Sequence, residues 1–176
     1  MTAPLICDVG TGSGCVIISL LHEQRKARGF AVDISPAAAR LALRNAARHQ
    51  VAERTSFVVA DGFAAFRQRE VNFDLIVSNP PYVTDRDFLS LQREVREHEP
   101  RMALTSGNDG LTMIRRLLDE ASVFLVDGGH MVLEIGYGQL AAVEQLIEAA
   151  GVWSVVAVRK DLQGIPRTVT LEKLGS

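Results

Sequence analysis

Near its N-terminus the chain reads Leu5-Ile6-Cys7-Asp8-Val9-Gly10-Thr11-Gly12-Ser13-Gly14. The first five residues form a short apolar run typical of a buried strand, and an apolar stretch suited to a helix, Cys15 to Leu21, follows the last glycine. A strand, a glycine turn and a helix make one half of a nucleotide-binding unit. Glycines let a backbone approach a ligand closely, and the N-terminus of the next helix offers unpaired N–H groups to an anion. The stretch therefore predicts a ligand-binding α/β sheet.

The spacing of the glycines limits the classes of ligand that this turn is expected to bind. A dinucleotide-binding turn has the pattern G-x-G-x-x-G, whereas Gly10, Gly12 and Gly14 bring the third glycine one place early. The G-x-S-x-G elbow of a hydrolase is not matched either. A tight turn that binds no ligand is the alternative interpretation.

Two further apolar runs lie next to a carboxylate: the first ends in Asp33, and the second is followed by Asp61. Gly29 to Asp33 is a predicted strand whose acid stands nineteen residues after the last glycine of the turn, where such an acid meets a ribose. Asp33 could accept hydrogen bonds from both ribose hydroxyls. Alternatively, its negative charge could only stabilise the positive N-terminal end of the next helix. Thr55 to Ala60 is a third predicted strand, followed by Asp61. Because parallel strands end along one edge of a sheet, Asp8, Asp33 and Asp61 are expected to line it.

The fourth predicted strand, Phe73 to Ser78, delivers Asn79-Pro80-Pro81-Tyr82 to the same edge. Proline fixes its own φ and keeps the preceding residue out of the helical region, so Asn79 and Pro80 are expected to be extended. The prolines donate no N–H, which leaves acceptors beside an aromatic ring. This set fits a planar NH2 group, although a Pro-Pro turn that only ends a strand is the alternative. Since the winding reverses between the first and fourth strands, the glycine turn and Asn79 should face each other across a crevice.

The remaining elements complete a seven-stranded sheet. Ser35-Pro36 is expected to cap and start a helix that runs to His49. The later pattern predicts helices over Leu111 to Leu125 and Gly138 to Ala150, ended by Gly151, and strands over His130 to Ile135 (entered through a Gly128-Gly129 turn), Trp153 to Val158 and Thr168 to Leu174. The predicted fold is α/β, a Rossmann-like doubly wound sheet of seven strands, mostly parallel, with a C-terminal antiparallel hairpin strand. Residues 1–176 are expected to form one domain.

A long polar and charged segment, Val83 to Asp109, lies within this domain. Its pattern favours a helix only over Asp85 to His98. A segment of this length in a compact domain is usually a lid or a substrate loop, and a solvated charged face is the alternative.

Composition restricts the class of protein. The 176 residues are 47% hydrophobic and 23% charged, with a net charge of −2, which suits one globular domain with a sizeable core. The pI of about 6.1 and the lack of a basic run argue against stable nucleic-acid binding. Cys7 and Cys15 are expected to be reduced core residues, and the cysteines and histidines show no zinc spacing, so no metal is expected. Without a secretory or membrane-spanning run, we expect a cytoplasmic protein. Separately, a monomer is expected.

Taken together, these residues resemble the class I S-adenosylmethionine-dependent methyltransferases, and within them the protein-(glutamine-N5) methyltransferases that modify translation release factors. The resemblance covers nearly the whole chain. The matching elements, in order, are Asp8-Val9-Gly10-Thr11-Gly12-Ser13-Gly14, Val32-Asp33-Ile34-Ser35, Asp61, Asn79-Pro80-Pro81-Tyr82, Glu99-Pro100 with Ala103-Leu104, Asn108-Asp109-Gly110-Leu111 and Leu133-Glu134-Ile135-Gly136. The glycine motif marks only the large class, and Asn-Pro-Pro-Tyr is shared with enzymes that methylate adenine or guanine. The later elements narrow the resemblance to the glutamine family.

The resemblance implies a methyl donor, S-adenosylmethionine, which leaves as S-adenosylhomocysteine. Its binding residues would be Asp8, Gly10, Thr11, Gly12, Ser13, Gly14, Asp33, Ile34, Asp61, Gly62 and Asn79. Gly10 to Gly14 would wrap the methionine end, Asp33 would hold the ribose, and Asp61 with the Gly62 backbone would meet the adenine. The substrate glutamine of a peptide chain release factor would be bound by Asn79, Pro80, Pro81 and Tyr82, of which Asn79, Pro80 and Tyr82 would be catalytic.

The chain departs from the family pattern in two places. Gly62 stands where members of the family often have a bulky Trp or Leu. Only Met1 to Pro4 precede the first strand, where the family normally carries a helical domain that docks the release factor, so we expect the catalytic domain alone. The rival interpretations are N-methylation of an amino group on DNA adenine or rRNA guanine, a nicotinamide dehydrogenase, which the glycine spacing disfavours, and a cofactor-binding module that does not catalyse.

Overall fold

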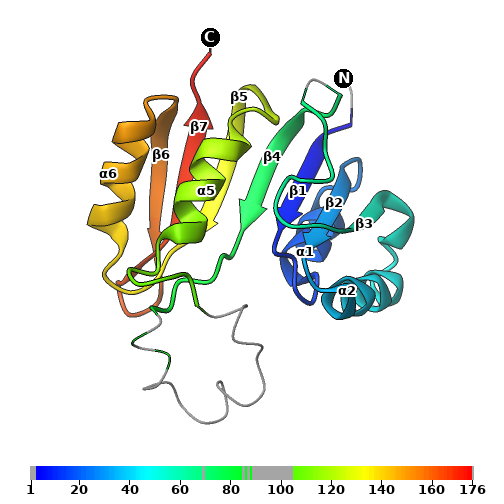
Figure 1. The fold of residues 1–176 in the computed structure, drawn as a ribbon. Coiled ribbons are helices and arrows are strands. Elements are labelled where there is room, and N and C mark those ends of the chain that lie inside the picture. The colour runs from blue at the N-terminus through cyan, green and yellow to red at the C-terminus, as the bar shows by residue number, and fades with distance from the viewer. Residues whose placement is uncertain (1–2, 69, 85, 87, 89–104, 176) are drawn as a thin grey trace.

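The computed structural model describes residues 3–68, 70–84, 86, 88 and 105–175. In this part of the chain a seven-stranded sheet has the order β3-β2-β1-β4-β5-β7-β6 (Figure 1). The strands are β1 (Leu5–Val9), β2 (Arg28–Asp33), β3 (Thr55–Val59), β4 (Phe73–Ser78), β5 (Leu125–Glu134), β6 (Trp153–Lys160) and β7 (Pro166–Lys173). All neighbours from β3 to β5 are parallel, and β7 is antiparallel to both β5 and β6. The predicted doubly wound sheet is confirmed.

The winding of the sheet reverses at β1. The chain moves outward from β1 to β2 and β3, then returns to place β4 on the other side of β1. Val9, the last residue of β1, pairs with Val32 of β2 and with Ser78 of β4. The segments that leave these three strands therefore start next to one another, as expected for the glycine turn and Asn79.

Four α-helices connect these strands in the described residues: α1 (Cys15–Glu23), α2 (Pro36–Arg48), α5 (Thr112–Ala121) and α6 (Leu140–Ala150). A short 3-10 helix, η1 (Ala52–Arg54), precedes β3. Ser35 caps α2 as predicted, because its hydroxyl accepts a hydrogen bond from the Ala38 amide at 3.3 Å. Within the part of the chain that the structure describes, no helix combines the length and hydrophobicity needed to cross a membrane.

Two apolar cores cover opposite faces of the sheet. Successive residues of a strand point to opposite faces, and Ile6 and Cys7 accordingly belong to different cores. Ile6 packs with α1, whereas Cys7 packs with the core that holds α5 and α6, which lie in front of the sheet in Figure 1. These layers fix the strands whose carboxyl ends carry the candidate site.

Several predicted boundaries differ from those in the structure. The helix expected over Leu111 to Leu125 spans only Thr112–Ala121, and Leu125 already belongs to β5. β5 runs through Gly128-Gly129, which was expected to be a turn, and its register against β4 is irregular there. The α6 helix begins at Leu140 and not at Gly138, because a φ of 75° at Gly138 lies outside the helical region. The helix expected over Asp85 to His98 falls mostly outside the described residues.

One cysteine also lies elsewhere than expected. Cys7 is fully buried, but Cys15 is exposed, and neither forms a disulfide. The buried residues of α1 are Ile17, Ile18 and Leu21, which face the sheet. Cys15 comes two residues before this face begins, in the first turn of the helix, so its side chain points to solvent.

Candidate active site

The glycine turn leaves room for a ligand next to its backbone. Gly10, Gly12 and Gly14 have φ values of 74°, 55° and 80°, a region that residues with a side chain adopt rarely. A Cβ added at Gly14 would lie 3.1 Å from the Ala42 Cβ, so this glycine lets α2 approach the turn. A Cβ added at Gly10 or Gly12 would meet no protein atom within 4 Å. The space beside these two glycines is therefore open.

Asp8 supports the turn from inside the protein. Its side chain is buried, and its Oδ2 accepts hydrogen bonds from the Thr11 hydroxyl at 2.7 Å and from the Ile17 amide at 3.3 Å. Burial, partly offset by these hydrogen bonds and reinforced by the charge of Asp33, raises the pKa of Asp8 to about 6. Asp8 and Thr11 thus hold the turn to α1, while Ser13 is exposed on its outer side.

Asp33 joins the second strand to the same turn. Its Oδ2 accepts a hydrogen bond from the Gly12 amide at 2.9 Å, and its Oδ1 accepts one from the Ser35 amide at 2.8 Å. Each carboxylate oxygen has two lone pairs, so both retain capacity for a hydroxyl donor. The neighbouring Ile34 is 51% exposed, which places an apolar surface next to these acceptors.

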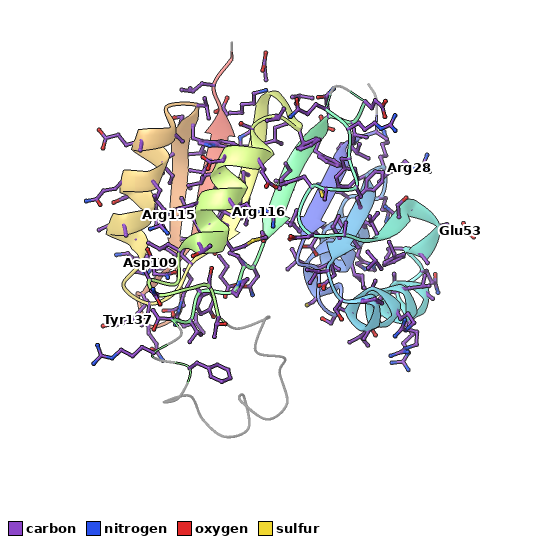
Figure 2. The ribbon with its side chains drawn as sticks, in the orientation of Figure 1. Arg28, Glu53, Asp109, Arg115, Arg116 and Tyr137 are labelled. Atoms are coloured by element: carbon purple, nitrogen blue, oxygen red, sulfur yellow. The ribbon has the colours of Figure 1, made fainter. Side chains whose placement is uncertain are left out.

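Asp61 is held by an arginine that the sequence reasoning missed. Arg116 of α5 donates from Nη1 to Asp61 Oδ1 at 2.5 Å and from Nη2 to the Asp61 carbonyl at 3.2 Å (Figure 2 labels Arg116). Its Nε also donates to Glu120 Oε1 at 2.7 Å. The hydrogen bond to Glu120, followed by that to Asp61, raises the pKa of Arg116 despite its partial burial.

The same arginine explains the small residue at position 62. Gly62 has a φ of 58°, and a Cβ added there would lie 3.0 Å from Arg116 Nη2. The guanidinium therefore occupies the space into which a bulky side chain would project. No sequence pattern indicates this contact, because Arg116 is far from Asp61 along the chain and resembles any charged residue on a helix.

The Asn79–Tyr82 loop starts from a fixed point in the sheet. Ser78 is buried, and its hydroxyl donates to the Val9 carbonyl at 2.7 Å. Asn79 is exposed directly after it, and Pro80 is buried. Among the described residues, none is recorded with a hydrogen bond to the Asn79 side chain. The structure thus places the glycine turn, Asp33 and Asn79 around the ends of three adjacent strands.

One groove in the described residues lies outside the candidate site. A groove of about 540 Å³ runs between α1 and α2 and is lined by Ser13, Cys15, Ile18, Ser19, His22, Glu23, Asn45 and His49. It shares only Ser13 with the predicted site residues. Its lining includes Ser13 of the glycine turn but not Asp33, Asp61 or Asn79, so we do not assign the candidate active site to this groove.

The fold is that of an α/β domain whose parallel sheet reverses its winding at β1, and domains of this class bind ligands beside the carboxyl ends of the strands at such a point. Residues 2–109 match the family model described as "Methyltransferase small domain", and the chain belongs to this family.

Among curated relatives, the chain is 42% identical over 171 residues to a release factor glutamine methyltransferase of Bradyrhizobium diazoefficiens, covering 97% of this chain and 57% of that protein. It is 44% identical over 165 residues to one of Cereibacter sphaeroides, covering 94% and 58%. The chain thus spans less than two thirds of the length of these relatives.

Solved structures of methyltransferases share the fold. A methyltransferase from Pyrococcus furiosus aligns with a TM-score of 0.71 at 17% identity, over 99% of this chain and 77% of that one. TrmN from Thermus thermophilus aligns with a TM-score of 0.67 at 20% identity, over 98% and 45%. The order of strands and the antiparallel β7 are therefore those of a methyltransferase domain.

Proposed function

We propose that this protein transfers a methyl group from S-adenosylmethionine to the side-chain amide nitrogen of a glutamine in a peptide chain release factor. The observation that carries the proposal is the junction of β1 and β4. The glycine turn follows Val9, the Asn79–Tyr82 loop follows Ser78, and these two strand ends are paired and hydrogen-bonded. Relatives that share about two fifths of the sequence carry the name of this activity.

The residues around the glycine turn suit the proposed cofactor. Open space beside Gly10 and Gly12 admits the methionine end close to the backbone, and the carboxylate of Asp33 offers acceptors for ribose hydroxyls. The exposed side chain of Ile34 offers an apolar surface for an adenine ring. Asp61 and Gly62, held by Arg116, would bound the adenine end. When bound, the sulfonium supplies an already activated methyl group.

The Asn79–Tyr82 loop suits an amide substrate. The Asn79 oxygen and the Pro80 carbonyl would accept both hydrogens of the glutamine NH2 group, which turns the nitrogen lone pair toward the methyl group. These dipoles would also stabilise the positive charge that develops on the nitrogen. Tyr82 would pack against the flat amide. Orientation of this kind contributes roughly 7 to 11 kcal/mol in favourable cases, so no general base is needed and the proton leaves to water.

We further propose that residues beyond this chain contribute to docking of the release factor. Specific protein–protein interfaces usually bury about 1,600 Å² in total, more than a crevice around one side chain supplies. The longer relatives allow a test: the Bradyrhizobium protein is compared with its segment that aligns to this chain. A raised KM for the segment is expected, and equal kcat/KM would refute this part of the proposal.

The proposed activity is tested with S-adenosylmethionine labelled in the methyl group. The protein is incubated with purified release factor, and in a parallel reaction with DNA or ribosomal RNA. Label on a single glutamine of the release factor is expected. Label only on a nucleic-acid base would favour the rival N-methylation of a base, and cofactor binding without any transfer would favour a non-catalytic module.

A further inference from the structure

One side chain at the start of α6 joins three loops around the proposed acceptor site. The Gln139 Oε1 accepts a hydrogen bond from the Gly136 amide at 2.8 Å. Its Nε2 donates to the carbonyls of Tyr82 at 3.3 Å and Gly110 at 3.2 Å. The Gly136 N–H can donate only to the side-chain oxygen of Gln139, and the two carbonyls can accept only from its side-chain nitrogen. These partners therefore fix the orientation of the Gln139 amide. Gln139 therefore links the loops that follow β4, precede α5 and follow β5.

The two glycines bonded to Gln139 also pack against Tyr82. A Cβ added at Gly110 would lie 2.3 Å from the Tyr82 carbonyl oxygen, and one added at Gly136 would lie 3.1 Å from Tyr82 Cδ2. Real Cβ atoms essentially never approach another atom within 3.0 Å. The Tyr82 carbonyl therefore lies against the backbone of Gly110 and the Tyr82 ring against that of Gly136, and Gln139 is hydrogen-bonded to both glycines.

Neighbouring contacts hold the same loop from its other side. The Ser106 amide donates to the Val83 carbonyl at 3.0 Å, and Val83 forms an isolated parallel bridge with Thr105. The loop that carries Gly110 is in turn fixed to α5, because Asp109 accepts hydrogen bonds from the Leu111 amide and from Arg115 (Figure 2 labels Asp109 and Arg115). The segment after Pro81 is thus connected to several elements, and Gln139 joins three of the loops involved.

We propose that Gln139 is a positioning residue for methyl transfer, which fixes Tyr82 and through it the acceptor loop. The inference rests on the proposed function. Asn79 stands between two fixed points, because Ser78 is bonded to β1 on one side and Tyr82 is bonded to Gln139 on the other. The rings of Pro80 and Pro81 leave little freedom between these points. Loss of the hydrogen bond between Gln139 and Tyr82 would displace the Asn79 side-chain oxygen and the Pro80 carbonyl, which orient the substrate nitrogen.

Two substitutions separate this role from general stability. Gln139→Glu keeps an oxygen for the Gly136 amide but places a second oxygen, which cannot donate, against the carbonyls of Tyr82 and Gly110. Gln139→Met keeps the length of the side chain and removes all three hydrogen bonds without adding charge. The control is Gln145→Glu, which makes the same chemical change at an exposed position of α6.

The readouts are the kinetics of transfer to release factor, the affinity for S-adenosylmethionine, and hydrogen exchange at the Ser106 amide. We expect both Gln139 variants to lower kcat by about tenfold to a hundredfold, since small misplacements of reacting groups have effects of this size, with cofactor affinity changed less than about twofold. Exchange at Ser106 should be faster, and exchange in β1 and α1 should match that of the control.

Other outcomes of these measurements would overturn the positioning role of Gln139. An unchanged kcat, or global unfolding of both Gln139 variants, would overturn the positioning role. An equal loss of cofactor affinity and kcat would overturn it as well, because the residue would then support the whole domain. If the unaltered protein transfers no methyl group to release factor, the proposed function fails separately. The exchange measurement then still decides whether Gln139 holds the loop, and unchanged exchange at Ser106 would refute it.

Discussion

The Ser78 hydroxyl donates a hydrogen bond to the Val9 carbonyl at 2.7 Å, in the buried centre of the sheet. The two residues also pair directly, as the last residues of neighbouring parallel strands. The glycine turn begins one residue after Val9, and Asn79 follows Ser78. The parts of the site assigned to the methyl donor and to the acceptor therefore start from one rigid junction.

Asp33 is expected to contribute strongly to cofactor affinity. Hydrogen bonds to a charged group are worth about 1.5 to 3 kcal/mol, so Asp33→Ala should weaken S-adenosylmethionine binding by roughly tenfold to a hundredfold. Asp33→Asn keeps an acceptor for the Gly12 amide and should lose less affinity. Isothermal calorimetry measures both, with Asp119→Ala on the exposed side of α5 as the control. Unchanged affinity in Asp33→Ala would remove this residue from the site.

Arg116 should affect cofactor binding through Asp61. Arg116→Ala removes both hydrogen bonds to Asp61 and opens the space beside Gly62, so we expect the affinity for S-adenosylmethionine to fall by about threefold to tenfold, on the order of one hydrogen bond. Arg115→Ala is the matched control, because this neighbouring arginine of α5 pairs with Asp109 instead. Equal affinities for the two variants would show that Arg116 only stabilises its helix.

Asp8 should make the stability of the protein depend on pH. Its folded pKa of about 6 lies above the ordinary value of 3.8, so the folded state holds the proton more tightly than the unfolded state. Its stabilising contribution is complete below about pH 4 and is lost as the pH rises through about 6, by up to roughly 3 kcal/mol.

Asp8→Asn is the test, because the amide oxygen can still accept from Thr11 and Ile17 but does not ionise. Urea unfolding should show the Asn variant gaining stability relative to the unaltered protein between pH 4 and pH 7. Asp74→Asn, at an exposed position of β4, provides a comparison. A difference between Asp8→Asn and the unaltered protein that does not change with pH would show that Asp8 does not titrate in this range.

Local patterns in the sequence predicted the sheet well. β1 and β4 have the predicted bounds, because each is a short apolar run limited by a turn. The irregular start of β5 was missed, since glycines normally indicate a turn, whereas Gly128 and Gly129 lie within the strand where its register against β4 shifts between Leu125 and His130. Cys15 was misplaced because apolar composition does not show which side of a helix faces the core.

The candidate site residues stay a prediction, and the contacts among them could not be predicted from the sequence. The motif elements around Gly110 and Gly136 could be matched, but their packing against Tyr82 depends on loops that meet only in three dimensions. Arg116 and Gln139 were missed for the same reason. A polar residue on a helix carries no signal in one sequence until the fold shows which atoms it reaches.

The proposed mechanism requires the Asn79 side-chain oxygen to orient the acceptor nitrogen, so substitution of Asn79 is the decisive experiment. Asn79→Ala should lower kcat for methyl transfer to release factor by about a hundredfold or more, with affinity for S-adenosylmethionine within a few fold of the unaltered protein, because the lost oxygen acts mainly in the transition state. The control is Asn72→Ala, an exposed asparagine at the other end of β4. Single-turnover transfer at saturating cofactor and release factor is the measurement. A rate near that of the unaltered protein would contradict the mechanism.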